Sequence, residues 1–232
     1  MLNPCFKKTI RAAVAVACAA TLAIGASACG ASNSGNGSDK VALLISTLNN
    51  PFFVDLRDGA QAEANKLGVN LLVSDAQNDS ATQQNQAQNA QSQGAKAVII
   101  NPVDSDAASP AVAPLLSANL PVISVDRSVT GEDVTAHIAS DNVAGGAQAA
   151  DELAKAIGEK GDIIILQGTP GAASTRDRGD GFKKEIKKYA GIKVVAEQTA
   201  NFDRSEALDV TSNLMQANPN IVGVYAENDE MA

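Results

Sequence analysis

The chain has 232 residues, of which 45% are hydrophobic and only 3% aromatic, and its formal net charge is −8. A protein this acidic is a poor candidate for binding nucleic acid, because it would repel the phosphates. Trp is absent and Phe occurs five times. Ala, Val, Ile and Leu are therefore expected to form the core, and the position of each aromatic residue is informative.

Residues 1–28 are predicted to be an export signal. Three basic residues lie near the start, and an apolar run of mostly small residues follows at 12–28. The letters "ASAC" at 26–29 resemble a bacterial lipobox, which predicts cleavage before Cys29 and a lipid anchor on it; an ordinary signal peptide cut nearby is the alternative. A membrane span is disfavoured because the apolar run is shorter than the roughly 20 residues that a bilayer requires.

Residues 29–39 are predicted to be a flexible tether, because "GASNSGNGSD" is small and polar. Cleavage would remove three basic and no acidic residues, taking the formal charge from −8 to −11. It would also leave Cys29 as the one remaining cysteine, so no internal disulfide is expected. We therefore expect an exported protein, at the cell surface or in the periplasm, that is lipid-anchored to the membrane through Cys29.

The rest of the chain alternates between apolar runs and helical patterns. Runs typical of strands occur at 41–46, 70–76, 97–103, 121–127, 162–168, 192–198 and 221–229. Helical patterns lie at about 51–67, 80–93, 104–118, 143–157, 176–189 and 204–217. The apolar runs are continuous, as in parallel strands that are covered on both faces. The alternation predicts a doubly wound α/β fold with parallel sheets.

The first predicted helix has recognisable ends. Asn50 can cap it, Pro51 fits its first turn and Gly68 can end it. Its apolar residues recur at steps of three and four, which predicts a buried stripe: Phe53, Leu56, Ala60, Ala64 and Leu67.

One segment interrupts the alternation. After Arg127 the sequence "SVTGEDVTAHIASDN" has turn residues and a short extended piece but no helix. We interpret 134–141 as a crossing between two lobes, which predicts an N-terminal lobe at 40–140 and a second one at 141–232.

Polar and aromatic side chains gather where the strands end. In open parallel sheets ligands bind beyond the carboxyl ends of the strands. The residues there are rich in amides and charged groups and include three of the five phenylalanines: the segment 46–53, Asp75, Asn101, Asp126, Arg127, Arg178, Asn201, Phe202 and Asn228. Charged and amide groups suit the hydroxyls at the rim of a sugar ring, and aromatic rings suit its C–H faces. The pattern favours a small sugar over a nucleotide.

Several of these residues also have a purely structural interpretation. Asn50 can be only a helix cap, and Phe53 matches the buried stripe of its helix. Asp126 and Arg127 can form a solvated turn. Phe202 belongs to no helical stripe, which favours a role at a ligand or an interface.

The remaining charged candidates are also ambiguous. Arg176 and Arg178 can pair with Asp177 or Asp180 on the surface. His137 is the only histidine and has no metal-ligand neighbours, so it is predicted to be structural.

The sequence gives no positive indication of catalysis. There is no G-x-G-x-x-G after the first strand, no G-x-x-x-x-G-K-[ST] and no G-x-S-x-G. Carboxylate pairs such as Asp104 and Asp106 are expected in any acidic α/β protein. We therefore predict a protein that is not an enzyme, with no catalytic residue, no cofactor and no metal site.

Seven segments, in order and spacing, resemble the bacterial ribose-binding proteins, which are the sugar receptors of ABC importers with the type I periplasmic binding protein fold. They are "STLNNPFF", "INPVDSDA", "PVISVDR", "HIASDNVAGG", "STRDRGDGF", "NFDR" and "YAENDEMA". The resemblance covers about residues 40–232. It implies two Rossmann-like lobes, joined by hinge crossings, that close on one sugar.

The resemblance also implies the site residues. In that family phenylalanines sandwich the sugar ring, and Asp, Asn and Arg side chains hold its hydroxyls. The matching sugar-binding positions are Ser46, Asn50, Phe52, Phe53, Asp126 and Arg127 in the first lobe, and Arg178, Phe202 and Asn228 in the second. It further implies a monomer that captures ribose and delivers it to an ABC transporter permease.

The chain departs from the family at its carboxyl end. Asp229 and Glu230 look like the acidic first turn of a further helix, and the family continues with more βα units. Those units carry another pocket Asp and a pocket Gln. We therefore expect a truncated chain with an incomplete second lobe, in which each lost contact leaves a sugar hydroxyl unpaired at a cost of about 1–3 kcal/mol.

Other functions remain as alternatives. The ligand can be another monosaccharide such as allose, xylose or a signalling furanose, because one or two contacts distinguish epimers. A sugar-responsive transcription regulator shares the fold, but it would need a basic helix-turn-helix where this chain has its signal peptide. The last alternative is a non-functional truncated fragment.

Overall fold

The computed structural model describes residues 39–232, so the predicted signal peptide, the anchor at Cys29 and most of the tether lie outside the described residues. The strands are β1 (Lys40–Ile45), β2 (Asn70–Asp75), β3 (Ala97–Ile100), β4 (Val122–Val125), β5 (Ala136–Ile138), β6 (Lys160–Gln167), β7 (Gly191–Thr199) and β8 (Ile221–Ala226). The helices are α2 (Pro51–Leu67), α3 (Ser80–Ser92), α4 (Ser109–Ser117), α5 (Asn142–Ala156), α6 (Ala173–Ile186) and α7 (Arg204–Ala217). Within this range, no helix has the length and apolar character that a membrane span requires.

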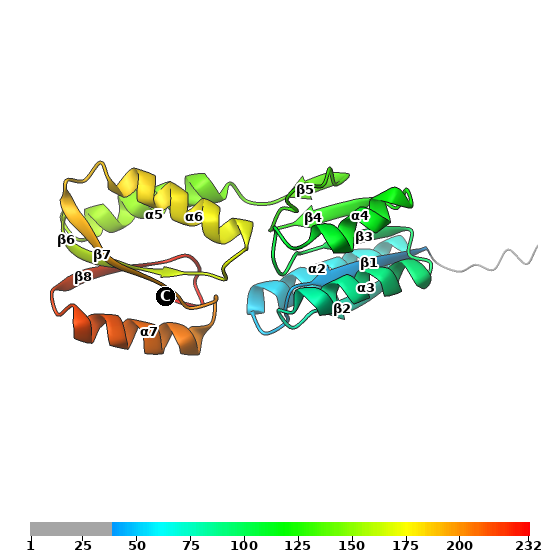
Figure 1. Ribbon diagram of the computed structural model, residues 1–232, viewed down its shortest axis with the longest axis horizontal. Coiled ribbons are helices and arrows are strands. Elements are labelled where there is room, and N and C mark those ends of the chain that lie inside the picture. Colours follow the sequence, from blue (N-terminus) through cyan, green and yellow to red (C-terminus); the bar gives the residue numbers. More distant parts are fainter. Residues whose placement is uncertain (1–38) are drawn as a thin grey trace, which may run out of the picture. The chain divides into compact units, whose positions relative to one another are not determined.

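The strands form two parallel sheets, one in each lobe (Figure 1). The first sheet has the order β2-β1-β3-β4-β5 and the second the order β7-β6-β8. In both, the chain changes winding direction beside the first strand, between β1 and β3 and between β6 and β8. Such switch points leave a crevice at the carboxyl ends of the strands, where ligands bind. The predicted α/β fold with two Rossmann-like lobes is confirmed.

The segment expected to cross between the lobes contributes a strand to the first sheet. β5 pairs in parallel with β4, and His137 lies beside Ser124 in the register. The Ser124 hydroxyl and Nδ1 of His137 are 2.8 Å apart, so the histidine has a structural partner. The exact lobe boundaries, 40–140 and 141–232, stay a prediction.

Helices cover both faces of the first sheet, as the continuous apolar runs predict. In β1, Ala42 and Leu44 pack with α3 and α4, whereas Leu43 and Ile45 pack with α2. The predicted α2 stripe is wrong at Leu67, whose side chain is 68% exposed. Leu67 is the last residue of α2, and the left-handed turn at Gly68, with φ of 68°, follows at once.

Two predicted helices begin elsewhere than expected. The helix predicted from 104 begins at Ser109, because the Asp104 carboxylate accepts hydrogen bonds from the backbone N–H of Asp106 and Ala107 and holds a turn there. The helix predicted from 176 begins at Ala173. Its first turn has no capping side chain, so the sequence carried no local start signal.

In the second lobe α5 and α6 lie together on one side of the sheet and α7 lies on the other (Figure 1). The core under α5 and α6 contains Ile163, Ile165 and a stacked pair, Phe182 and Tyr225, with ring centroids 3.8 Å apart. Leu166 packs on the opposite side against α7.

Close packing of α5 on α6 depends on a glycine. A Cβ on Gly146 would overlap the backbone carbonyl of Arg178, whereas a Cβ on the neighbouring Gly145 meets nothing within 4 Å. Gly146→Ala is therefore expected to destabilise the protein by about 1–3 kcal/mol through overpacking. Gly145→Ala should stabilise it by about 0.5–1 kcal/mol through helix propensity. Urea denaturation of both variants checks the prediction, and equal effects would contradict it.

Candidate sugar-binding site

The loop after β1 and the start of α2 place the first group of predicted residues. Asn50 Oδ1 accepts a hydrogen bond of 2.9 Å from the backbone N–H of Phe52 and so caps α2. The Phe52 ring is half exposed and meets the Phe53 ring edge to face, with centroids 5.1 Å apart. Phe53 is buried in the core below α2. The structural interpretation is therefore confirmed for both residues, and each also lines the pocket described below, whereas their contact with a sugar stays a prediction.

A network of buried hydrogen bonds connects Ser46, Asn101 and Asp126, the last of which lines the pocket. Ser46 Oγ donates to Asn101 Oδ1 at 2.6 Å, and Asn101 Nδ2 donates to Asp126 Oδ2 at 3.2 Å. Asp126 has a left-handed backbone with φ of 62°, a conformation that is uncommon outside glycine. Ser46 is fully buried and does not line the pocket, so its role as a direct sugar contact stays a prediction. Asn101 lies at a predicted strand end but is not among the predicted sugar-binding positions.

Arg127 is the most buried charged residue of the site, with a side chain only 2% exposed. Its Nη1 donates to the backbone carbonyls of Pro102 and Val103, at 3.0 and 2.9 Å. Burial lowers the pKa of Arg127, and the charge of the Asp126 carboxylate, 3.7 Å from Nε, opposes that shift. A solvated turn at these positions is therefore excluded.

The Arg127 guanidinium also lies between aromatic rings from the two lobes. Its Cζ is 5.4 Å from the ring centroid of Phe53 and 5.8 Å from that of Phe202. These distances suit cation–π contacts. Phe202 has a left-handed backbone with φ of 60°, and its ring covers Gly168, where a Cβ would overlap the ring.

Arg178 projects from α6 and is fixed at two points. Nε donates to Asn142 Oδ1 and Nη1 donates to the backbone carbonyl of Glu227, both at 2.8 Å. It does not pair with Asp177 or Asp180, and Arg176 pairs instead with Asp106 of the first lobe at 3.2 Å. Surface pairing with the neighbouring aspartates is therefore wrong for both arginines.

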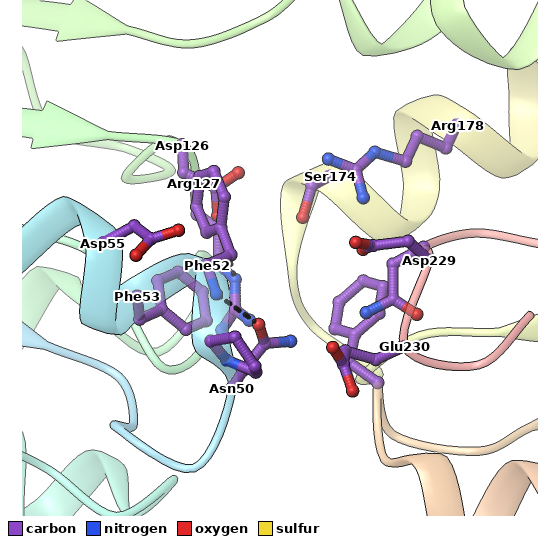
Figure 2. Close-up of a pocket in the computed structure, with 13 residues that line it drawn as sticks. Asn50, Phe52, Phe53, Asp55, Asp126, Arg127, Ser174, Arg178, Asp229 and Glu230 are labelled. Carbon is purple, nitrogen blue, oxygen red and sulfur yellow. Dashed lines mark hydrogen bonds and ion pairs between the residues drawn. The ribbon is translucent and has the colours of Figure 1, made fainter.

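The side chains surround one cavity of about 250 Å³. Figure 2 shows residues of the first lobe, among them Asn50, Phe53 and Arg127, facing Ser174, Arg178 and Glu230 of the second. The predicted residues that line it are Asn50, Phe52, Phe53, Asp126, Arg127, Arg178, Phe202 and Asn228. This volume is below the range of about 300–1,000 Å³ that is typical of pockets for drug-sized molecules, as suits a smaller ligand.

The cavity has further lining residues that the sequence reasoning did not assign, among them Asp55, Ser174, Asp229 and Glu230. Two of them follow from helical spacing, since Asp55 lies three residues after Phe52 and Ser174 four before Arg178, on the same helix faces. Glu230 forms an ion pair of 2.9 Å with Arg204. Among residues 39–232, no three His, Cys, Asp or Glu side chains gather as metal ligands would.

Comparison with known proteins identifies the family. The sequence family described as the periplasmic binding protein domain matches residues 41–232. The chain belongs to this family. The ribose import binding protein RbsB of Salmonella typhimurium is 50% identical over 194 residues, which cover 84% of this chain and 65% of that relative. RbsB of Bacillus subtilis is 44% identical over 202 residues, covering 87% of this chain and 66% of the relative. The chain thus spans slightly less than two thirds of the length of these curated relatives.

A solved structure of a related protein has the same fold. A periplasmic solute-binding protein of an ABC transporter from Actinobacillus succinogenes, with bound D-allose, superposes with a TM-score of 0.77 at 36% identity. The superposition covers 84% of this chain and 70% of that one. Among these relatives, two are named for ribose import and one was solved with bound D-allose.

Proposed function

We propose that this periplasmic binding protein is the substrate-binding component of an ABC sugar importer and that it captures D-ribose between its two lobes. The relatives of highest identity quoted above are ribose import binding proteins, which favours ribose. A second candidate ligand is D-allose, because the structural relative from Actinobacillus succinogenes holds that sugar. These relatives are binding proteins, which also favours a function without catalysis.

The observation that carries the proposal is the environment of Arg127. Its Nε is buried and has no hydrogen-bond partner within the part of the chain that the structure describes. Buried N–H groups are almost always paired, so a site with an unpaired donor suits a ligand that brings an acceptor. Phe53 and Phe202 flank the same guanidinium from different lobes. A sugar offers oxygen atoms that can accept a hydrogen bond from Arg127, and its ring has apolar C–H faces that can pack against the two phenyl rings.

Contacts between the lobes support capture by closure. Ser105 of the first lobe donates its backbone N–H to the carbonyl of Gly171, and its Oγ accepts from the backbone N–H of Ala173, both at 3.0 Å. Arg176 and Asp106 add an exposed ion pair, which contributes about 0–1 kcal/mol. A sugar that touches both lobes would stabilise this closed arrangement relative to an open one.

The cellular setting belongs to the same proposal. Membership of the family favours an exported protein that works in the periplasm or at the cell surface. We infer anchoring through a lipid on Cys29, function as a monomer and delivery of the sugar to a membrane permease.

Isothermal titration calorimetry of the chain with D-ribose tests the function. We expect saturable binding of one sugar per chain, and weaker binding of D-allose and D-xylose. Tighter binding of D-allose than of D-ribose would indicate that D-allose, the second candidate, is the ligand. Absence of heat with every monosaccharide would contradict a sugar-binding function.

A further inference from the structure

Glu227 is a buried carboxylate to which the proposed site assigns no role. It follows the last residue of β8 and directly precedes Asn228 of the pocket. The residue is only 3% exposed. Its Oε2 accepts a hydrogen bond of 2.7 Å from the backbone N–H of Gly168, whereas Oε1 is buried and has no partner within residues 39–232. A single neutral donor is little compensation for a buried charge.

The contacts of Glu227 lead to two groups of the pocket. The Gly168 backbone that it holds lies directly beneath the Phe202 ring, with no room for a Cβ between them. Its own backbone carbonyl accepts the hydrogen bond from Arg178 Nη1. Glu227 thus contacts Gly168, which supports the Phe202 ring, and also accepts a hydrogen bond from the Arg178 guanidinium.

The charged and titratable groups around Glu227 do not neutralise it. They are Arg178 and Lys183 on α6, Glu197 on β7, Tyr225 on β8, and Asp141 and Asp229 beside the hollow that Glu227 helps to line. Lys183 pairs with Glu197 at 3.3 Å, and the hydrogen bonds of Arg178 go to Asn142 and to a backbone carbonyl. No ion pair of Glu227 itself occurs among the described residues.

Burial therefore raises the pKa of Glu227 from 4.5 to about 7, although the Gly168 hydrogen bond and the charges of Lys183 and Arg178 act in the opposite direction. The unfolded chain would lose this proton near 4.5 and the folded chain near 7. The contribution of the proton to stability is complete below about pH 4.5 and is lost as the pH rises through about 7.

We propose that Glu227 is a positioning residue that supports the sugar pocket in its protonated form, so that its ionisation weakens sugar binding. A protonated carboxyl keeps its oxygen acceptor for Gly168 and carries no charge. An ionised one would attract water and the Arg178 guanidinium, and would thereby displace groups that face the sugar. The effect on affinity rests on the proposed function, whereas the protonation of Glu227 does not.

The test compares the wild type with Glu227→Gln, which keeps the shape and one acceptor but cannot ionise. Glu152→Gln is the matched control, because it removes one negative charge from an exposed position on α5 in the same lobe. Ribose titrations from about pH 5.5 to about pH 8.5 should show a loss of affinity of roughly three- to tenfold in the wild type and in Glu152→Gln. Glu227→Gln should keep its affinity throughout. Identical pH profiles for the wild type and Glu227→Gln would overturn the proposal.

Two further measurements do not depend on sugar. The melting temperature of the wild type should fall relative to that of Glu227→Gln as the pH rises through about 7, with Glu152→Gln following the wild type. The infrared spectrum of the wild type below about pH 7 should contain a protonated carboxyl band that disappears at higher pH. Absence of that band refutes protonation even if the variant folds poorly. Absence of ribose binding at every pH would instead refute the proposed function and the predicted effect on affinity.

Discussion

Arg127→Ala is expected to abolish measurable ribose binding and to lower the free energy of unfolding by about 3–5 kcal/mol, as removal of one partner from a buried charge pair does. The change leaves the carbonyls of Pro102 and Val103 without their donor. It also leaves Asp126, whose side chain is 14% exposed, without the cation beside it. Urea denaturation gives the stability, and calorimetry with ribose gives the binding.

Two variants separate the causes. Arg127→Lys keeps the positive charge but loses the planar fork, so it should lose most of the binding while losing less stability. Arg57→Ala is the surface control, because among residues 39–232 Arg57 pairs with the neighbouring, exposed Asp58, and its effect should stay within about 0.5 kcal/mol. Ribose affinity that survives Arg127→Ala unchanged would contradict the assignment of the pocket.

Phe202→Ala is expected to weaken ribose binding by about 2–3 kcal/mol, or roughly 30- to 150-fold, because it removes one aromatic wall of the cavity. The ring also covers Gly168 and lies near the Arg127 guanidinium. The sugar would therefore lose a face contact, and water would reach the charged groups. Calorimetry measures the affinity, and circular dichroism at increasing temperature shows whether the fold is kept.

The controls for Phe202 distinguish shape from mere apolar volume. Phe202→Leu should recover only part of the affinity, because leucine lacks the flat face. Leu208→Ala, at a residue 69% exposed on α7 of the same lobe, should change neither binding nor stability noticeably. Unchanged affinity in both Phe202→Ala and Arg178→Ala would be incompatible with a pocket shared by the two lobes.

The fold was predictable because its determinants are local in the sequence. Continuous apolar runs such as that of β6 require cover on both faces of a sheet, and helices cover both faces of each of the two sheets. The position of the pocket followed from the same reasoning, since polar groups at the ends of parallel strands converge. Residues such as Asn50 and Phe53 were ambiguous from sequence because a cap or core residue can line a cavity as well.

What could not be predicted depends on contacts between distant segments or on unusual backbone geometry. The left-handed conformations of Asp126 and Phe202 have no glycine to indicate them. The partner of Arg176 is Asp106, 70 positions away and in the other lobe, so no local pattern pairs them. Glu227 resembles an ordinary polar residue after a strand until its burial beside Gly168 is known.

The packing of α5 on α6 has a mechanical consequence. Arg178 is bonded to Asn142, the first residue of α5, and its carbonyl lies against Gly146 one turn later. Asn142 directly follows the segment 134–141, through which the chain passes from one sheet to the other. One hydrogen bond, from Arg178 Nε to Asn142 Oδ1, therefore links a guanidinium that lines the pocket to the residue at which the connecting segment ends.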